Sequence, residues 1–345
     1  MQVESVMAGA LMTAGANVLI QVTCVLSAGW LLERIATRRG PEAVAWVQRA
    51  TLVSVLLIPA AAIAMHSLMP RSGVYVSLPE PAAMGGPLSA VGLVYLLLSM
   101  IWFAGTVWGL MRLALGMRKA KALVDSSLPA DGFWTDRAKQ LARQEGLPPE
   151  RIDVLDVRIS DQVGGPCLVG MRRPALILPA ANLHACNDLV LLHELTHLRR
   201  SDNFWGVVTS AVRSSVWVHP LAWRLRRAHH VASEHACDDA VLASRPNAVE
   251  YVRSLVSFSN AGPLVPAAVP AASLFGKRGE LLERSRRLLS QTDGHVEKAR
   301  ARGFATLPAT ALILGGVVLA STLFAVHHTS TAALAGWALL WCAMP

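Results

Sequence analysis

The chain has 345 residues, of which 53% are hydrophobic and only 16% are charged, and its formal net charge is +9. A soluble domain carries about 25% charged residues, so this composition argues against an ordinary soluble protein and predicts that much of the chain lies in a lipid bilayer. The basic residues form no lysine tract and no aromatic-basic pattern, so we expect no direct contact with nucleic acid. The five scattered cysteines include no C-x-x-C pair, which indicates free thiols.

Several apolar stretches are long enough to cross a bilayer as helices, which takes about 20 residues. They cover residues 7–32, 50–69, 87–110 and 305–326. No basic segment precedes the first stretch, which indicates a retained span and not a cleaved signal peptide. A further apolar stretch at residues 204–223 has Arg213 at its middle, and we expect it to form a buried helix near the membrane surface, with a true span as the alternative. The uncharged tail at 331–345 is short for a span and is expected to be interfacial or re-entrant.

Basic residues between these stretches orient them, because loops rich in lysine and arginine stay in the cytoplasm. The first loop contains four arginines, including Arg49, whereas residues 70–86 contain one basic residue. The segment from 112 to 302 is again basic and should be cytoplasmic, with both chain ends outside. The predicted organisation is three transmembrane helices in 1–116, a cytoplasmic domain in 117–304, a fourth transmembrane helix in 305–327 and a short outside or interfacial tail in 328–345.

The cytoplasmic segment has the pattern of an α+β domain. A helix is predicted near 134–145 and a helical pattern runs from 187 to 259, with strands at 152–157 and 175–178 and residues 163–169 between them. Asn187 or Asp188 is a suitable N-cap for the first helix of the long helical run. Pro166 and Pro174 suit an edge strand, which could pair with a substrate peptide or could simply be blunted by proline.

The residue types that carry chemistry gather in the pentapeptide HELTH at 193–197. Positions i and i+4 share one face of a helix, so His193 and His197 could hold one zinc ion while Glu194 reaches its bound water. The plain alternative is a helix with two unrelated histidines. A catalytic zinc site needs a third protein ligand, for which Glu234 is the best candidate. Asp238 lies one turn farther on the same face and could accept the second ring N–H of a ligand histidine.

Other residues compete for roles at this site. His235, Cys237 and Asp239 are rival ligands, although His235 faces about 100° away from Glu234 on a helix. His219 or Tyr251 could supply a second electrophile for the transition state. Asp202 could support a ligand histidine or could simply pair with a nearby arginine.

Further motifs follow the pentapeptide in order: Arg200-x-Asp202, the block WVHPLAW at 217–223, and Glu234-x-x-Cys237-Asp238. With these motifs the chain resembles the antirepressor membrane metallopeptidases of the BlaR/MecR type, closely over residues 188–242. The resemblance implies an α+β membrane protein, in which a multi-span helical region of the bacterial inner membrane carries an inserted cytoplasmic gluzincin-type zinc peptidase domain. It implies one zinc ion per chain, with the bilayer, a protein substrate and a second copy of the chain as candidate partners.

The activity that the resemblance implies is hydrolysis of peptide bonds during transmembrane signalling. The substrate would be a cytoplasmic protein such as a transcriptional repressor, or the chain itself, with the basic segment from Arg284 to Arg287 as a candidate self-cleavage region. The β-lactam-sensing members carry a large outer domain after the fourth span, whereas only 18 residues, 328–345, follow it here. We therefore expect that β-lactam sensing does not carry over.

Two other classes of function stay open on the sequence. A housekeeping membrane peptidase of the CAAX-processing or quality-control type would share H-E-x-x-H and a downstream glutamate. A non-catalytic signalling scaffold would hold a structural zinc ion, which would require a fourth protein ligand such as Cys237 or His235.

Overall fold

The computed structural model describes residues 2–68, 74–78, 90–258, 272–273, 278–290 and 307–328. Its α-helices are α1 (Gln2–Ala36), α2 (Pro41–Leu68), α3 (Ala90–Ser126), α4 (Gly132–Gln144), α5 (Pro149–Asp153), α6 (Asp188–Arg200), α7 (Asp202–Ser215), α8 (Pro220–Ser244), α9 (Ala248–Ser257), α10 (Arg278–Ser290) and α12 (Leu307–Leu323). Its strands are β1 (Val74–Leu78), β2 (Leu128–Pro129), β3 (Asp156–Ser160), β4 (Cys167–Val169), β5 (Ala175–Pro179), β6 (Ala272–Ser273) and β7 (Phe324–His328). The expected interfacial tail lies outside the described residues.

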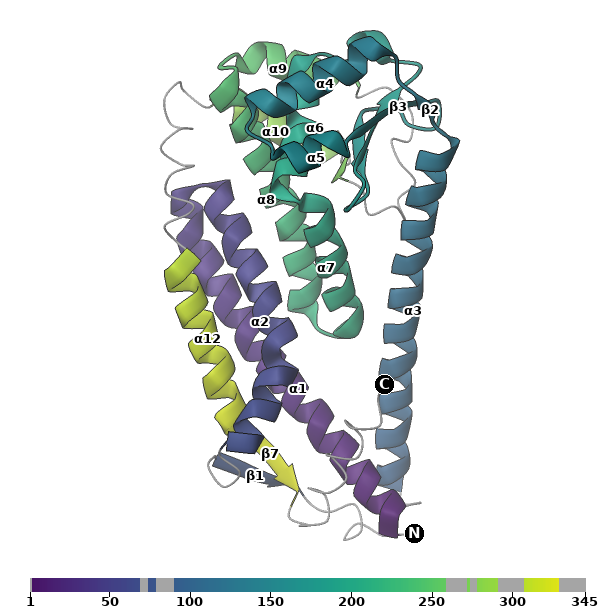
Figure 1. Cartoon of the computed structure of the whole chain (residues 1–345). Coiled ribbons are helices and arrows are strands. Elements are labelled where there is room, and N and C mark those ends of the chain that lie inside the picture. Colours follow the sequence, from purple (N-terminus) through teal and green to yellow (C-terminus); the bar gives the residue numbers. More distant parts are fainter. Residues whose placement is uncertain are drawn as a thin grey trace.

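Three of the described helices are long and apolar enough to cross a membrane, judged by length and composition. These candidate spans are Asn17–Arg39, Pro41–Ala61 and Leu96–Ser126, in agreement with a multi-span chain. Helices α1, α2 and α12 pack together below the other domain, and α3 runs along the opposite side (Figure 1). The apolar side chains of α3 are largely exposed, which suits contact with lipid. Helix α3 continues as one helix to Ser126, past the predicted boundary at 116.

The fourth apolar stretch ends earlier than the sequence predicted. Helix α12 stops at Leu323, and β7 follows it and pairs in parallel with β1. The prediction of a helix through residue 326 is therefore wrong. Local apolar composition does not distinguish a buried helix from a short strand. Here residues 324–328 form a strand because they pair with β1, which is distant in the sequence.

Helix α2 begins at Pro41, well before the predicted start of the second span at residue 50. Proline is favoured at the first helical position, and Gly40 before it has a φ of 102°, which breaks the chain away from the preceding 3-10 helix η1 (Thr37–Arg39). Arg49 therefore lies inside a helix and is only 4% exposed. Its prediction as a residue of the first loop is wrong.

The apolar stretch at 204–223 is not one buried helix but a helical hairpin. Helix α7 ends at Ser215, a four-residue turn follows, and α8 begins at Pro220 with His219 as its N-cap. The hairpin descends between α2 and α3 (Figure 1). Gly105 and Gly109 on α3 allow the close approach, because an added Cβ at Gly105 would lie 2.4 Å from the ring of Trp217.

The upper domain is built on the mixed sheet β2-β3-β5-β4-β6, in which β3 and β5 are parallel and β4 is antiparallel to both of its neighbours. The predicted strand at 152–157 is shifted to Asp156–Ser160, because Pro149 at the first helical position starts the short helix α5 instead. The predicted strand at 175–178 is confirmed as β5.

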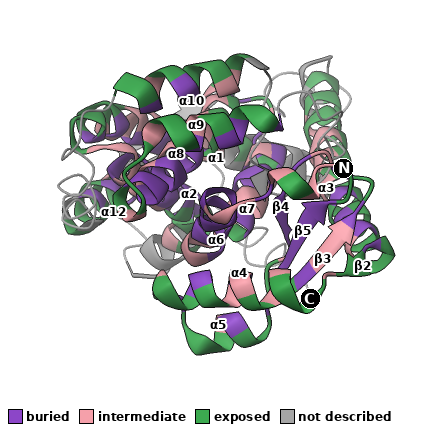
Figure 2. Ribbon diagram, turned by 90° about the horizontal axis from the view of Figure 1, so that it is seen from above, coloured by how far each residue is buried: buried purple, intermediate pink, exposed green. Residues whose placement is uncertain are grey.

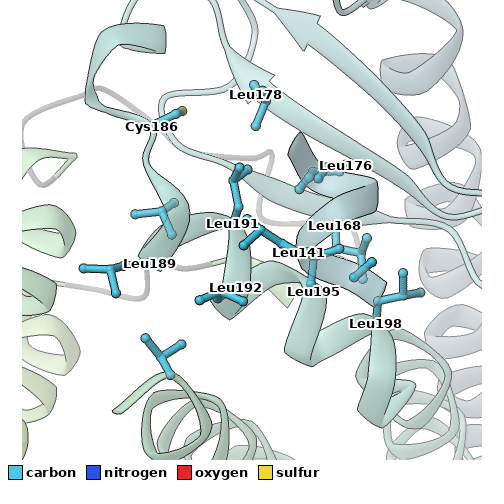
Figure 3. Close-up of a cluster of buried hydrophobic side chains, with 14 of the residues drawn as sticks. Leu141, Leu168, Leu176, Leu178, Cys186, Leu189, Leu191, Leu192, Leu195 and Leu198 are labelled. Atoms are coloured by element: carbon cyan, nitrogen blue, oxygen red, sulfur yellow. The ribbon is translucent and has the colours of Figure 1, made fainter. Parts of the chain in front are cut away.

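Helix α6 crosses the middle of this domain, between the sheet and helices α8 and α9 (Figure 2). Asn187 is its N-cap and its side chain accepts a hydrogen bond from the Val190 amide, as predicted. Every residue from Leu189 to Leu198 is buried. Leucines of α6 pack against Leu141 of α4 and against the strands (Figure 3). A helix buried on all sides can present polar residues only to partners inside the protein.

We expect Gly105→Val to weaken the packing of the hairpin on α3, because the new side chain must displace the ring of Trp217. Overpacking of this kind costs about 1–3 kcal/mol. Gly206→Ala on α7 is the matched control, since nothing lies within 4 Å of the added Cβ. Thermal unfolding of both variants in detergent checks this. An equal Tm for Gly105→Val and the parent would contradict the described close approach.

Candidate metal centre

Three side chains from two helices meet in the buried interior above the hairpin. His193 and His197 project from one face of α6, and Glu234 reaches them from α8. The two histidine Nε2 atoms lie 3.1 Å apart. The carboxylate oxygens of Glu234 lie 3.6 Å from His193 Nε2 and 3.4 Å from His197 Nε2. Sequence reasoning named all three residues, and the fold brings them together.

These separations suit a small tetrahedral ion. Zinc binds nitrogen and oxygen ligands at about 2.0–2.2 Å, so two ligand atoms of a tetrahedral site lie about 3.3 Å apart. Glu234 Oε1 is buried and has no hydrogen-bond partner among the described residues. Burial alone would raise the pKa of Glu234, but Arg284 holds the pKa well below its usual range. An ionised carboxylate oxygen that accepts no hydrogen bond is available to a metal ion.

The ring of His197 is fixed from behind by Asp202. Asp202 Oδ2 lies 2.8 Å from His197 Nδ1, which directs Nε2 toward Glu234. Ser201 joins α6 to α7 with a left-handed φ of 57°, and this sharp corner returns Asp202 to the histidine only five residues earlier. Burial alone would raise the pKa of Asp202, but Arg200, His197 and Arg49 hold it well below its usual range.

The ring of His193 has a corresponding carboxylate. Its Nδ1 lies 2.7 Å from Tyr251 Oη and 3.3 Å from Asp238 Oδ1, and Tyr251 donates to Asp238 at 2.8 Å. Arg284 of α10 donates to both oxygens of Asp238, at 2.6 and 2.9 Å. Each histidine therefore uses its outer nitrogen for a carboxylate or hydroxyl and leaves Nε2 for a metal, which is the usual arrangement behind a ligand histidine.

Glu194 follows His193 on α6 and is completely buried. Neither of its carboxylate oxygens has a hydrogen-bond partner among the described residues. Burial raises the pKa of Glu194 to about 7, although the two histidines oppose the shift. A buried carboxylate without partners beside a metal group is placed to exchange a proton near neutral pH.

Asp239 forms an ion pair with Arg287 of α10, and the other two rival ligands also lie elsewhere. Cys237 Sγ is 3.4 Å from His197 Nδ1, the ring nitrogen that Asp202 already holds, and burial raises the pKa of Cys237 to about 11. It is therefore a neutral thiol behind the histidine. His235 lines a cavity of about 500 Å³ between α1, α2 and α8. Neither residue offers an atom to the group around Nε2.

The predicted second electrophiles do not reach the group formed by the two Nε2 atoms and Glu234. Tyr251 is fully buried and lies behind His193, where it positions the ring. The ring of His219 contacts Thr23 of α1 at 2.9 Å and accepts from the Leu221 amide at 3.3 Å. His219 precedes Glu234 by fifteen positions along α8, or ~22 Å at the α-helical rise.

Sequence reasoning missed two arginines at this centre, Arg49 and Arg284. Arg284 stands one turn from Leu281 and from Leu288, on the apolar face of α10, and an arginine there is a signal for a buried partner. Its Nη1 lies 2.8 Å from Glu234 Oε2, and it is 3% exposed. The segment from Arg284 to Arg287 lies within helix α10, and although Arg286 is exposed, a helical segment is not the extended chain that a protease needs, which argues against self-cleavage there.

The edge of β4 is also occupied. Strand β6 pairs with it in antiparallel register, with Cys167 opposite Ser273 and Leu168 opposite Ala272. Strand β6 also contacts α6 and α7. A segment of the chain itself thus lies where the sequence suggested that a substrate peptide could add.

We expect Glu234→Ala to lose bound zinc, because it removes one of three ligands and leaves Arg284 buried with one partner fewer. His235→Ala is the matched control, since it changes the neighbouring residue on α8 without touching the metal group. Zinc per chain is measured by metal analysis after gel filtration of both variants. Undiminished zinc in Glu234→Ala would contradict its assignment as the third ligand.

Comparisons with known proteins agree with this geometry. The family described as BlaR1 peptidase M56 matches residues 17–288. A relative, the regulatory protein BlaR1 of Bacillus licheniformis, is 33% identical over 86 residues, which are 24% of this chain and 14% of that protein. The chain thus matches only a small part of that relative's length. Because the family match covers well over half of the sequence, the chain belongs to the BlaR1 peptidase M56 family.

Proposed function

We propose that the chain is an integral-membrane zinc metallopeptidase that hydrolyses peptide bonds of a protein substrate in transmembrane signalling. The observation that carries this proposal is the convergence of two Nε2 atoms and one carboxylate next to a buried glutamate without partners. Membership of a peptidase family supports hydrolysis over other metal chemistry.

Each residue of the site has its own proposed role in peptide hydrolysis. Zinc, when bound, lowers the pKa of a water molecule and polarises the scissile carbonyl. Glu194 takes the proton of that water as general base and later gives it to the leaving amine as general acid. Asp202 and Asp238 keep the two histidines in the tautomer that leaves Nε2 free.

The substrate is proposed to be a cytoplasmic protein, such as a repressor, or the chain itself. The pairing of β6 with β4 supports the second alternative, because it lays an extended segment of the chain along a strand that borders α6. Peptidases commonly hold their substrates by adding them to a sheet edge, since main-chain hydrogen bonds then align the peptide without regard to its sequence.

The proposed location is the bacterial inner membrane, with the peptidase domain in the cytoplasm. Three candidate spans and the basic loops beside them support this orientation. A homodimer is proposed as a further state of the chain.

A structural zinc site in a non-catalytic scaffold is less well supported. Such a site would be closed by a fourth protein ligand. Over the described part of the chain, the metal group around Nε2 consists of His193, His197 and Glu234 alone, and Cys237 lies behind His197. The position next to Glu194 thus stays open for water, as catalysis needs.

We expect Glu194→Ala to abolish proteolysis and to retain zinc, because Glu194 handles the proton and does not ligate the metal. Glu150→Ala, at the exposed start of α5, is the control for loss of a carboxylate. Comparative proteomics of cells with the parent and each variant would measure activity and identify the substrate. Cleavage that persists in Glu194→Ala would rule out this mechanism.

The raised pKa of Glu194 also predicts a pH dependence. A general base acts only when deprotonated, so kcat/KM should rise with pH through the pKa of Glu194. Burial places that pKa at about 7, and a bound zinc charge lowers it, so the midpoint should lie at or below about 7. A pH profile on an identified substrate checks this, with bound zinc measured at each pH to separate loss of the base from loss of the metal. An activity that decreases from pH 5 to pH 7 at constant zinc would contradict the role of Glu194.

A further inference from the structure

Arg49 is a buried charge inside a candidate membrane span. It lies on α2 within Pro41–Ala61, and its side chain is 4% exposed. Its guanidinium lies close to two indoles, 5.2 Å from the ring of Trp46 and 5.4 Å from that of Trp205 on α7. A charge within an apolar span is costly, and it persists where a specific partner compensates for its desolvation.

That partner is the carboxylate that holds a metal-ligand candidate. Arg49 Nη2 donates to Asp202 Oδ1 at 2.5 Å, and Asp202 Oδ2 lies 2.8 Å from His197 Nδ1. The three side chains are at most 5% exposed. A continuous line of short polar contacts therefore runs from a candidate transmembrane helix to the ring of His197.

Helix α2 makes a second contact with the same group. Arg200, the last residue of α6, donates to Asp202 at 3.2 Å and also forms an ion pair with Glu42 on α2. Asp202 is thus contacted by Arg49, which belongs to α2, and by Arg200, which is paired with Glu42 of α2. From α8, Ser233 Oγ donates to Asp202 Oδ1 at 3.4 Å and Cys237 Sγ donates to Asp202 Oδ2 at 3.7 Å.

We propose that Arg49 is a positioning residue: through Asp202, the packing of α2 against α7 sets the orientation of the His197 ring. This rests on the proposed function, because it takes the group of His193, His197 and Glu234 as the zinc site. Without Arg49, Asp202 keeps only Arg200 as an arginine partner and can turn toward it, so its contact with His197 Nδ1 is no longer fixed. Loss of such an outer contact typically lowers metal affinity by about 10–100-fold.

The test uses the full-length chain in lipid nanodiscs, loaded with zinc or with cobalt as a spectroscopic substitute. Zinc affinity is measured by competition with a chelator, and cobalt absorption reports the ligand geometry directly. Arg49→Gln should lower zinc affinity by about 10–100-fold and change the cobalt spectrum. Arg49→Lys keeps the charge but not the geometry of the guanidinium, and should be intermediate.

The matched control is Arg224→Gln. Arg224 of α8 pairs with Glu33 of α1 at 2.9 Å, so it also links the two parts of the molecule, but it contacts neither a ligand histidine nor an outer carboxylate. This variant should keep the parent affinity and spectrum. In addition, Asp202→Asn combined with Arg49→Gln should lower the affinity no more than Asp202→Asn alone, if Arg49 acts only through Asp202.

A parent-like affinity and spectrum in Arg49→Gln, even with a lower Tm, would reduce Arg49 to a structural ion pair and overturn the proposal. If Arg49→Gln does not fold, Arg49→Lys decides, since a parent-like spectrum in that variant overturns the proposal equally. A parent chain that binds no metal would sink the proposed function and this inference together. A parent that binds zinc tightly without cleaving any protein would refute the peptidase alone.

Discussion

The carboxylate of Asp202 is almost completely buried. The packing around the candidate metal centre depends on compensating the free-energy cost of removing this charge from water. A buried carboxyl group stays ionised only when it is paired and hydrogen-bonded, and otherwise its pKa rises, as at Glu194. Asp202 obtains its partners from α2, from the end of α6 and from the ring of His197. His197 and Arg200 are close to Asp202 in the sequence, whereas Arg49 is 153 residues away, so the pairing of this one carboxylate ties the candidate membrane helix α2 to the corner between α6 and α7.

The second histidine repeats this arrangement with different elements. Asp238 is fully buried behind His193 and is held by Arg284 from α10 and by Tyr251 from α9. Burial alone would raise the pKa of Asp238, but Arg284 and His193 hold it well below its usual range. Asp202 and Asp238 are therefore both ionised. The arginines that lower their pKa come from before and after residues 193–197 in the sequence.

The sequence was sufficient for the parts of the site that follow from helical periodicity. His193 and His197 share a face because they are four residues apart, and Glu234 and Asp238 repeat that spacing on the next long helix. The N-cap at Asn187 was predictable for the same local reason. The role of Arg49 was not predicted, because it depends on the corner at Ser201 and on the packing of α2 against α7, although the start of α2 at Pro41 has a local signal in the proline itself. The hairpin at 204–223 was hidden as well, since a turn within an apolar run has no compositional signal beyond Pro220. The positions of His219 and Tyr251 away from the two Nε2 atoms also depend on tertiary contacts, which residue spacing alone does not predict.

The hairpin turn has a consequence for how the chain assembles. Its backbone bends beside α3, whose side chains supply partners for its carbonyl groups: Trp102 Nε1 and Thr106 Oγ1 both donate to the Ser215 carbonyl. In return Trp217 Nε1 donates to the Trp102 carbonyl. In an apolar environment a backbone carbonyl without a donor costs several kcal/mol, so the tip of the hairpin can leave water only together with α3. Entry of the hairpin tip into an apolar layer would therefore depend on its contacts with α3, and the domain above the hairpin would share that dependence.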